Sequence, residues 1–215
     1  MTQALTRITV PAAREARRSI IWLHGLGADG HDFEPVVPLL GLGAETRVIF
    51  PHAPVRPISI NGGMPMRGWY DIISFERRHE DATGIAASFA LLEALYEEEK
   101  AQGIDAENIL FAGFSQGGAM ALHLGLRLPC AGILSLSAYL LDADNCPPAG
   151  QRAHLPILQI HGDDDNIVPY ALGEASRDVL LARGYHPQWQ GYPIAHEVSR
   201  EEIDFIGKWL HSLGF

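Results

Sequence analysis

Short apolar runs recur along the chain, and stretches rich in polar residues, glycine or proline separate them. A continuous apolar run that is too short for a helix is typical of a strand buried on both faces of a parallel sheet. We expect the first of these strands to lie at an edge of the sheet. The pattern predicts strands at residues 8–10, 19–23, 46–50, 109–112, 131–136, 155–160 and 185–190.

Between these runs, apolar residues repeat at helical spacing, as Ile85, Leu92 and Tyr96 do. Because strands alternate with helices from end to end, we expect an α/β protein with a mostly parallel central sheet and helices on both faces. No repeat, low-complexity segment or linker interrupts the pattern, so we expect a single domain over residues 1–215. The predicted helices are residues 32–40, 81–102, 118–126, 170–183 and 197–213.

Residues 51–78 show no helical pattern and are rich in proline and glycine. A long irregular segment in a compact domain is usually functional. Its large apolar side chains suggest a wall beside a substrate, but they are equally consistent with a small hydrophobic cluster that only holds the segment in place. These side chains are Met64, Met66, Trp69, Tyr70 and Phe75.

Composition narrows the range of functions. The chain has 215 residues, 47% of them hydrophobic, which is enough for one domain with a full core. Its formal charge of −10 and its pI of about 5.4 disfavour nucleic acid as a partner and stable association with an anionic membrane. Two cysteines, Cys130 and Cys146, and an N-terminal region without an apolar leader indicate a cytoplasmic protein.

The pentapeptide GFSQG, at residues 113–117, stands between a predicted strand and a predicted helix. In this context G-x-S-x-G is typical of a nucleophile elbow, which exposes a serine hydroxyl, here that of Ser115. The first amides of the following helix favour an anion at the same point. The alternative is a glycine-rich turn that only allows a helix to pack against a sheet.

A serine nucleophile needs a base, and the base needs an acid that orients it. In folds with a nucleophile elbow, these partners follow in the order serine, aspartate, histidine. His196 follows the last predicted strand. The strand before it is followed by three candidate acids, Asp163, Asp164 and Asp165. Spacing does not choose among the three, one of which is expected to cap the next helix.

An oxyanion hole needs two amides directed at one point. One candidate is the N–H of Gln116, the residue after the nucleophile. The other lies in the glycine-containing loop at residues 24–27. We expect His24, at the end of a strand, to have a structural role and not to act as a second base.

Several motifs resemble, in the same order, those of the phospholipase/carboxylesterase family of α/β-hydrolases, which includes bacterial carboxylesterases and acyl-protein thioesterases. They are HGLG at 24–27, NGG at 61–63, WYD at 69–71, GFSQGG at 113–118, HGDDDNIVP at 161–169, and His196. The resemblance covers most of the chain and implies an α/β-hydrolase fold without a separate lid domain. It implies a catalytic triad of Ser115, Asp165 and His196. It also implies an oxyanion hole formed by the amides of Leu26 and Gln116, and it makes a homodimer one of our expectations.

Together these features predict a serine carboxylesterase that hydrolyses small to medium-chain esters through an acyl-enzyme, with no cofactor or metal ion. We expect its substrate to be a small-molecule ester, bound by Met66, Trp69 and Tyr70 in a shallow apolar groove. The resemblance is closer to bacterial carboxylesterases at residues 64–69 and at Ala28, where the eukaryotic thioesterases have aspartate. The alternatives are an acyl-protein thioesterase or a lysophospholipase and, more distantly, a binding protein without turnover.

Overall fold

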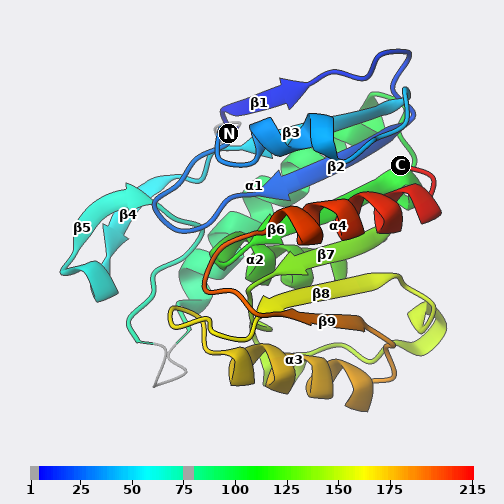
Figure 1. Cartoon of the computed structure of the whole chain (residues 1–215). Helices are drawn as coiled ribbons and strands as arrows, with labels where there is room; N and C mark the ends of the chain where they lie inside the picture. Colours follow the sequence, from blue (N-terminus) through cyan, green and yellow to red (C-terminus); the bar gives the residue numbers. More distant parts are fainter. Residues whose placement is uncertain (1–4, 75–79) are drawn as a thin grey trace.

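A computed structural model of the chain describes residues 5–74 and 80–215 (Figure 1). Within these residues, seven strands form the central sheet in the order β1-β3-β2-β6-β7-β8-β9. β1 is antiparallel to β3, and the other neighbouring pairs are parallel. The strands are β1 (Arg7–Val10), β2 (Arg18–Leu23), β3 (Thr46–Pro51), β6 (Ile109–Phe114), β7 (Gly132–Leu136), β8 (Ile157–Gly162) and β9 (Gln188–Tyr192).

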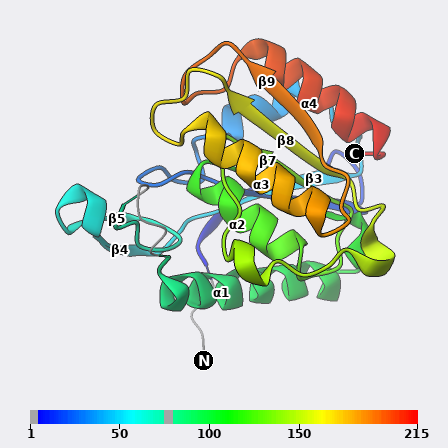
Figure 2. The same ribbon diagram turned by 90° about the horizontal axis from the view of Figure 1, so that it is seen from below.

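Helices cover both faces of this sheet (Figure 2). Successive side chains of a strand point to opposite faces, so each continuous apolar run supplies two cores. In β6, Phe111 is buried with side chains of α1, α2 and α3, whereas Leu110 is buried with those of α4 and the 3-10 helix η1. These helices are α1 (Ala82–Ala101), α2 (Gln116–Gly125), α3 (Tyr170–Ala182), α4 (Arg200–Ser212) and η1 (Glu34–Leu39).

The predicted α/β architecture is confirmed, and most predicted elements agree with the structure to within a few residues. The predicted helix at residues 32–40 is instead the short 3-10 helix η1. The reason is that Pro38 lacks the amide hydrogen that an α-helix would use at this position, whereas Pro35 lies in the first turn, where amides have no partner within the helix. The shorter 3-10 turns elsewhere are η2 (Ser59–Asn61), η3 (Ala106–Asn108), η4 (Ala143–Asn145) and η5 (Gly150–Arg152).

The expectation of an irregular segment at residues 51–78 was wrong in part, because the segment contains an antiparallel hairpin. Its strands are β4 (Val55–Ile58) and β5 (Met64–Arg67), and the hairpin projects from the body of the molecule (Figure 1). Pro57 and Pro65 face each other across the hairpin, and proline normally argues against a strand. Phe75, which we included among the apolar side chains, lies outside the described residues.

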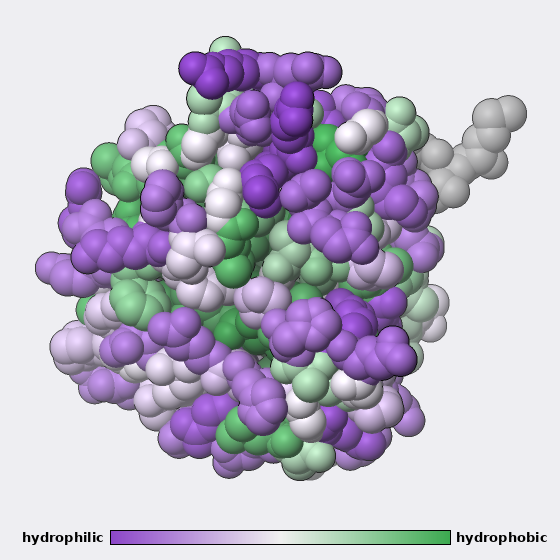
Figure 3. Space-filling view, turned by 90° about the vertical axis from the view of Figure 1, so that its right-hand side faces the viewer, coloured by the Kyte–Doolittle hydropathy of each residue, from purple (hydrophilic) through white to green (hydrophobic). Residues whose placement is uncertain are grey.

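The carboxyl ends of the parallel strands all lie along one edge of the sheet. Sites form at these strand ends in open α/β folds. The loops that follow β2, β6, β8 and β9 therefore lie near one another at this edge. The opposite edge, on the right of Figure 1, faces the viewer in Figure 3 and carries mostly hydrophilic side chains. Among the described helices, none is long and apolar enough to cross a bilayer.

Candidate active site

Ser115 occupies a tight turn between β6 and α2. Its backbone has φ of 55° and ψ of −121°, a conformation that non-glycine residues rarely adopt and that is common at functional sites. Its amide donates a 2.8 Å hydrogen bond to the carbonyl of Leu136. A Cβ on Gly113 would lie 2.3 Å from backbone of Gly117, and one on Gly117 would lie 2.2 Å from the oxygen of Leu23. Only glycine fits at either position, which accounts for the motif.

His196 joins the serine to an aspartate. Its Nε2 lies 2.9 Å from Oγ of Ser115, and its Nδ1 lies 2.7 Å from Oδ2 of Asp165. The imidazole also packs against the ring of Phe114, with 4.7 Å between the ring centroids. Because a carboxylate can only accept, Nδ1 carries the proton and Nε2 is left to accept from the hydroxyl. The three residues therefore form a continuous hydrogen-bonded chain.

Asp165 is held by hydrogen bonds within the loop that follows β8. Its Oδ1 accepts the amides of Ile167 and Val168 at 2.9 and 2.8 Å, so Oδ2 is left to His196. The buried His161 lies next to Asp165. Its Nε2 is 2.8 Å from the oxygen of Val168 and 3.4 Å from Oδ2 of Asp165. Burial lowers the pKa of His161, which favours a neutral ring that donates from Nε2 to this carbonyl.

The other two aspartates have different surroundings. Asp163 and Asp164 are exposed, whereas the side chain of Asp165 is fully buried. Geometry thus selects Asp165 as the partner of the histidine, as the family resemblance implied. The expected capping aspartate is absent among the described residues: Pro169 is the N-cap of α3, and no side chain caps it.

Two backbone amides near Ser115 are available for an oxyanion. Gln116 is the first residue of α2, so its N–H has no acceptor within the helix. Leu26 lies in the loop after β2, and its N–H meets no acceptor in the part of the protein that the structure describes. This loop runs close to the elbow, because a Cβ on Gly25 would lie 3.5 Å from Cβ of Ser115.

The structure confirms that His24 has a structural role. Its Nδ1 lies 2.7 Å from the oxygen of Gly25, and its Nε2 accepts the amide of Ala53 at 3.0 Å. Burial lowers its pKa to about 4, so the ring is neutral at pH 7 with its proton on Nδ1. Within the described residues, no group of three or more His, Cys, Asp or Glu side chains is arranged to hold a metal ion.

The three residues expected to bind substrate lie in different environments. Met66 is half-buried on β5. Trp69 has an exposed fraction of 0%, so the expectation that its side chain forms the wall of an open groove was wrong. This burial could not be predicted, because an irregular segment has no periodicity that separates buried from exposed apolar residues.

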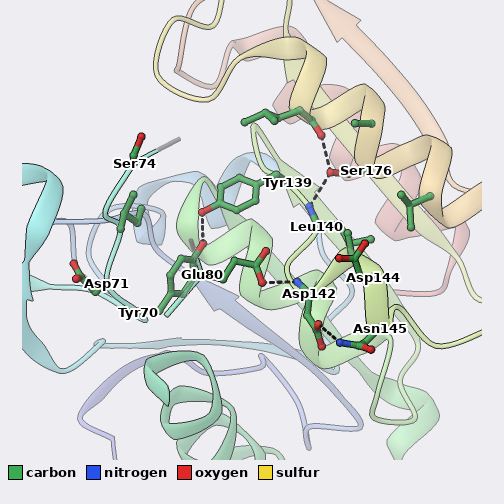
Figure 4. A pocket seen from close by; sticks show the side chains of 15 residues that line it. Tyr70, Asp71, Ser74, Glu80, Tyr139, Leu140, Asp142, Asp144, Asn145 and Ser176 are labelled. Atoms are coloured by element: carbon green, nitrogen blue, oxygen red, sulfur yellow. Dashed lines mark hydrogen bonds between the residues drawn. The ribbon is translucent and has the colours of Figure 1, made fainter. Parts of the chain in front are cut away.

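Tyr70 lines a cavity of about 370 Å³ (Figure 4). Its hydroxyl lies 2.9 Å from that of Tyr139, and its carbonyl accepts the side-chain amide of Gln116 at 2.7 Å. The cavity lies between residues 70–74, the loop after β7 and α3, and it has both apolar and acidic lining. The apolar side chains include Ile72, Leu140, Leu172 and Val179, and the acidic ones include Asp71, Glu80, Asp142 and Asp144.

A sequence model of the phospholipase/carboxylesterase family matches residues 5–213. The chain belongs to this family. Among the relatives of this phospholipase/carboxylesterase family member, acyl-protein thioesterase 1 of Neurospora crassa is 40% identical over 94% of this chain and 89% of that protein. Acyl-protein thioesterase 1 of Gibberella zeae is 37% identical over 94% of this chain and 93% of that protein.

Solved structures of similar proteins share the fold of this family member. The crystal structure of acyl-protein thioesterase 2 from Zea mays is similar, with a TM-score of 0.83 and 30% identity, over 97% of this chain and 98% of that one. SOBER1 from Arabidopsis thaliana has a TM-score of 0.82 and 28% identity, over 93% of this chain and 100% of that one. The chain is thus a hydrolase with the α/β-hydrolase fold.

Proposed function

We propose that this hydrolase cleaves acyl thioesters, and oxygen esters of the same acyl groups, through a covalent acyl-enzyme on Ser115. The observation that carries the proposal is the hydrogen-bonded chain from Asp165 to His196 to Ser115, with distances of 2.7 and 2.9 Å. A serine hydroxyl needs this arrangement to become a nucleophile at neutral pH. An assembled triad also argues against the alternative of a binding protein without turnover.

The first half-reaction forms the acyl-enzyme. Oγ of Ser115 bonds to the carbonyl carbon while its proton passes to Nε2 of His196. The carbonyl electron pair moves to the oxygen, and the resulting oxyanion accepts hydrogen bonds from the amides of Leu26 and Gln116. When the oxyanion collapses, the bond to sulfur or oxygen breaks and the leaving group takes the proton from His196.

The second half-reaction releases the acid. Water bonds to the acyl carbon and gives a proton to His196, which returns it to Oγ of Ser115 as the acyl bond breaks. Throughout, Asp165 keeps the proton of the imidazole on Nδ1 and stabilises the imidazolium. Since Oδ1 is already bound to two amides, the carboxylate is held in the orientation that this role needs.

Relatives favour the thioester over the oxygen ester as the preferred substrate. The sequence alone predicts a carboxylesterase, with an acyl-protein thioesterase or a lysophospholipase as the alternative. Proteins named acyl-protein thioesterase 1 match this chain over nearly all of its length, which supports the alternative more strongly. The carboxylesterase remains the second candidate, because the matching family model is described as phospholipase/carboxylesterase and the same triad serves both leaving groups.

The cavity beside Tyr70 is the proposed site for the distal part of the acyl group. Its volume of about 370 Å³ lies within the range of small-ligand sites. It begins at a residue whose carbonyl is bound to the side chain of Gln116, next to the nucleophile. Each methylene that it buries should contribute about 0.8 kcal/mol, or about fourfold in kcat/KM, until it is full.

The test compares thioesters and oxygen esters of one short peptide, acylated on cysteine or serine with chains from acetyl to palmitoyl. We expect kcat/KM to be higher for the thioester at each length and to rise until the cavity is full. Ala175→Phe, which places a ring in the cavity, should move the optimum to shorter chains. Ala171→Phe is the matched control, because Ala171 is exposed on the same helix and does not line the cavity.

Two results would contradict this assignment. Higher kcat/KM for oxygen esters at every length would favour the carboxylesterase. An unchanged chain-length optimum in Ala175→Phe would exclude the cavity as the acyl site.

A further inference from the structure

Trp69 is buried and donates hydrogen bonds to the two elements that carry the amides of the proposed oxyanion hole. Its backbone N–H donates to Oε1 of Gln116 at 2.8 Å. Its indole Nε1–H donates to the carbonyl of His24 at 3.0 Å. One half of the hole is the amide of Gln116, and the other is the amide of Leu26, two residues after His24. A single residue thus connects the elements that carry both amides.

The connection to Gln116 is made on both sides of its side-chain amide. Oε1 accepts from Trp69, and Nε2 donates to the carbonyl of Tyr70 at 2.7 Å. The side chain is 1% exposed, so water does not compete for these bonds. Since the backbone N–H of the same residue is a proposed oxyanion donor, the position of Trp69 and Tyr70 restrains the start of α2.

The connection to the loop that carries Leu26 is made at several points. Besides the indole bond, the amide of Gly27 donates to the carbonyl of Arg67 at 2.8 Å. A Cβ on Gly68 would lie 3.0 Å from Cδ1 of Leu26, so the side chain of Leu26 packs closely against the backbone of Gly68. The ring of Trp69 also packs against that of His24, with centroids 5.3 Å apart. Residues 67–69 thus contact the loop on both sides of Leu26.

Trp69 is itself fixed from the side of α1. Ser88, a buried residue of that helix, donates from its hydroxyl to the carbonyl of Trp69. Every backbone and side-chain polar group of Trp69 therefore has a partner within the described residues. These hydrogen bonds hold the backbone and the indole of Trp69 in one position. A residue that sets the separation of two other groups must itself be held in this way.

We propose that Trp69 is a positioning residue, which sets the separation of the amides of Leu26 and Gln116 and so tunes the oxyanion hole. The proposal rests on the function proposed above, because it concerns the same reaction. Oxyanion donors act only when they are already directed at the developing charge. A displacement of about 1 Å can cost about 10²-fold in rate. Trp69 touches no reacting atom, and its effect passes through the two donors.

The main test is Trp69→Phe, which keeps an aromatic ring and removes the indole N–H. We expect kcat to fall about tenfold with KM within about twofold of wild type, because substrate binding does not require the oxyanion. Trp22→Phe is the matched control. Trp22 is equally buried, and its indole N–H has no acceptor among the described residues, so the same substitution removes no hydrogen bond. It should leave kcat unchanged.

A second measurement separates a positioning role from a merely structural one. A trifluoromethyl ketone adds to Ser115 and forms an oxyanion, whereas the matching methyl ketone binds without doing so to a comparable extent. In Trp69→Phe, affinity for the trifluoromethyl ketone should fall by the same factor as kcat, and affinity for the methyl ketone should not change. Should this variant fail to fold, Gln116→Met, which removes the acceptor of the Trp69 amide, should give the same two results.

Three outcomes would overturn the proposal. The first is a Trp69→Phe enzyme that matches Trp22→Phe in kcat and in affinity for both ketones. The second is a rise in KM or a change in chain-length preference with kcat intact, which would make Trp69 part of the acyl site. The third is an equal loss of affinity for both ketones. Failure of the proposed function is distinguishable, because it would appear as full activity in Ser115→Ala whatever Trp69→Phe does.

Discussion

Two regions build the candidate site by different physical routes. Ser115, Asp165 and His196 each follow a parallel strand, so the topology of the sheet brings them to one edge. Residues 51–74 begin at the end of β3, which lies at the same edge, and residues 52–74 contain no strand of the main sheet. Their position depends on hydrogen bonds to Gln116 and to the loop after β2. The first region supplies reactive groups, and the second fixes where the oxyanion donors lie.

The second region has two parts that differ in burial. In its hairpin, Val55 and Met64 are each 62% exposed, whereas Trp69 and Tyr70 are almost completely buried. The hairpin is therefore a projection from a well-packed base, and within it Arg67, at the end of β5, contacts the loop that carries Leu26. If the comparison holds, changes in the first region should abolish the reaction, and changes in the second should alter its rate or the stability of the fold.

The largest effect is expected for Ser115→Ala. Removing the nucleophile should lower kcat by about 10⁶, as it does in other triads. Alanine has the same backbone strain as serine at this φ, so thermal unfolding should stay close to wild type. Rates on a thioester substrate and a melting curve check both parts. Substantial residual turnover would show that the first region does not supply the nucleophile.

The next effect separates the three neighbouring aspartates. Asp165→Asn should lower kcat by about 10⁴, because the amide favours the wrong tautomer of His196. Asp163→Asn and Asp164→Asn should stay within a few-fold of wild type, since both side chains are exposed. Steady-state kinetics of the three variants, each checked for folding, provide the comparison. A greater loss in Asp163→Asn would contradict the assignment.

A smaller effect is expected at His24, whose ring accepts the amide of Ala53 near the start of the second region. The folded pKa is about 4, below the ordinary value of 6.5, so the unfolded chain binds the proton first as pH falls. Stability from this neutral ring is complete above pH 6.5 and is lost as pH falls toward 4. At pH 5 the loss should be roughly 2 kcal/mol in the free energy of unfolding.

His24→Gln should remove this contribution and keep an acceptor for Ala53. Urea unfolding at pH 8 and at pH 5 measures the change. The difference between the two pH values should be smaller in the variant than in wild type. An equal difference in both proteins would show that His24 is not the group responsible. His123, whose pKa burial also lowers to about 4, accounts for part of the acid sensitivity that remains.

The contrast between the regions also shows how much the sequence could predict. The strands of the main sheet were predictable, because few structures are compatible with continuous apolar runs. The order of Ser115, Asp165 and His196 was also predictable, because few structures place a glycine-bounded serine between a strand and a helix. The choice of Asp165 over its neighbours needed the family resemblance, since adjacent residues of one loop differ only in where their side chains point.

Sequence reasoning failed mainly in residues 51–74. Paired prolines at 57 and 65 concealed the hairpin, although an isolated two-stranded ribbon has free edges that tolerate proline. The role of Trp69 was also concealed, because its partners are a side chain 47 residues later and a carbonyl 45 residues earlier. Local periodicity carries no information about hydrogen bonds at that sequence separation.

The central claim is that Ser115 is the activated nucleophile of this hydrolase. The most direct measurement is labelling of the native protein with a fluorophosphonate, followed by mass spectrometry of the peptides. The probe reacts with serines that a neighbouring base activates, so the account predicts one adduct per chain, on Ser115, and none in Ser115→Ala. An adduct on another serine, or labelling of Ser115→Ala, would contradict it.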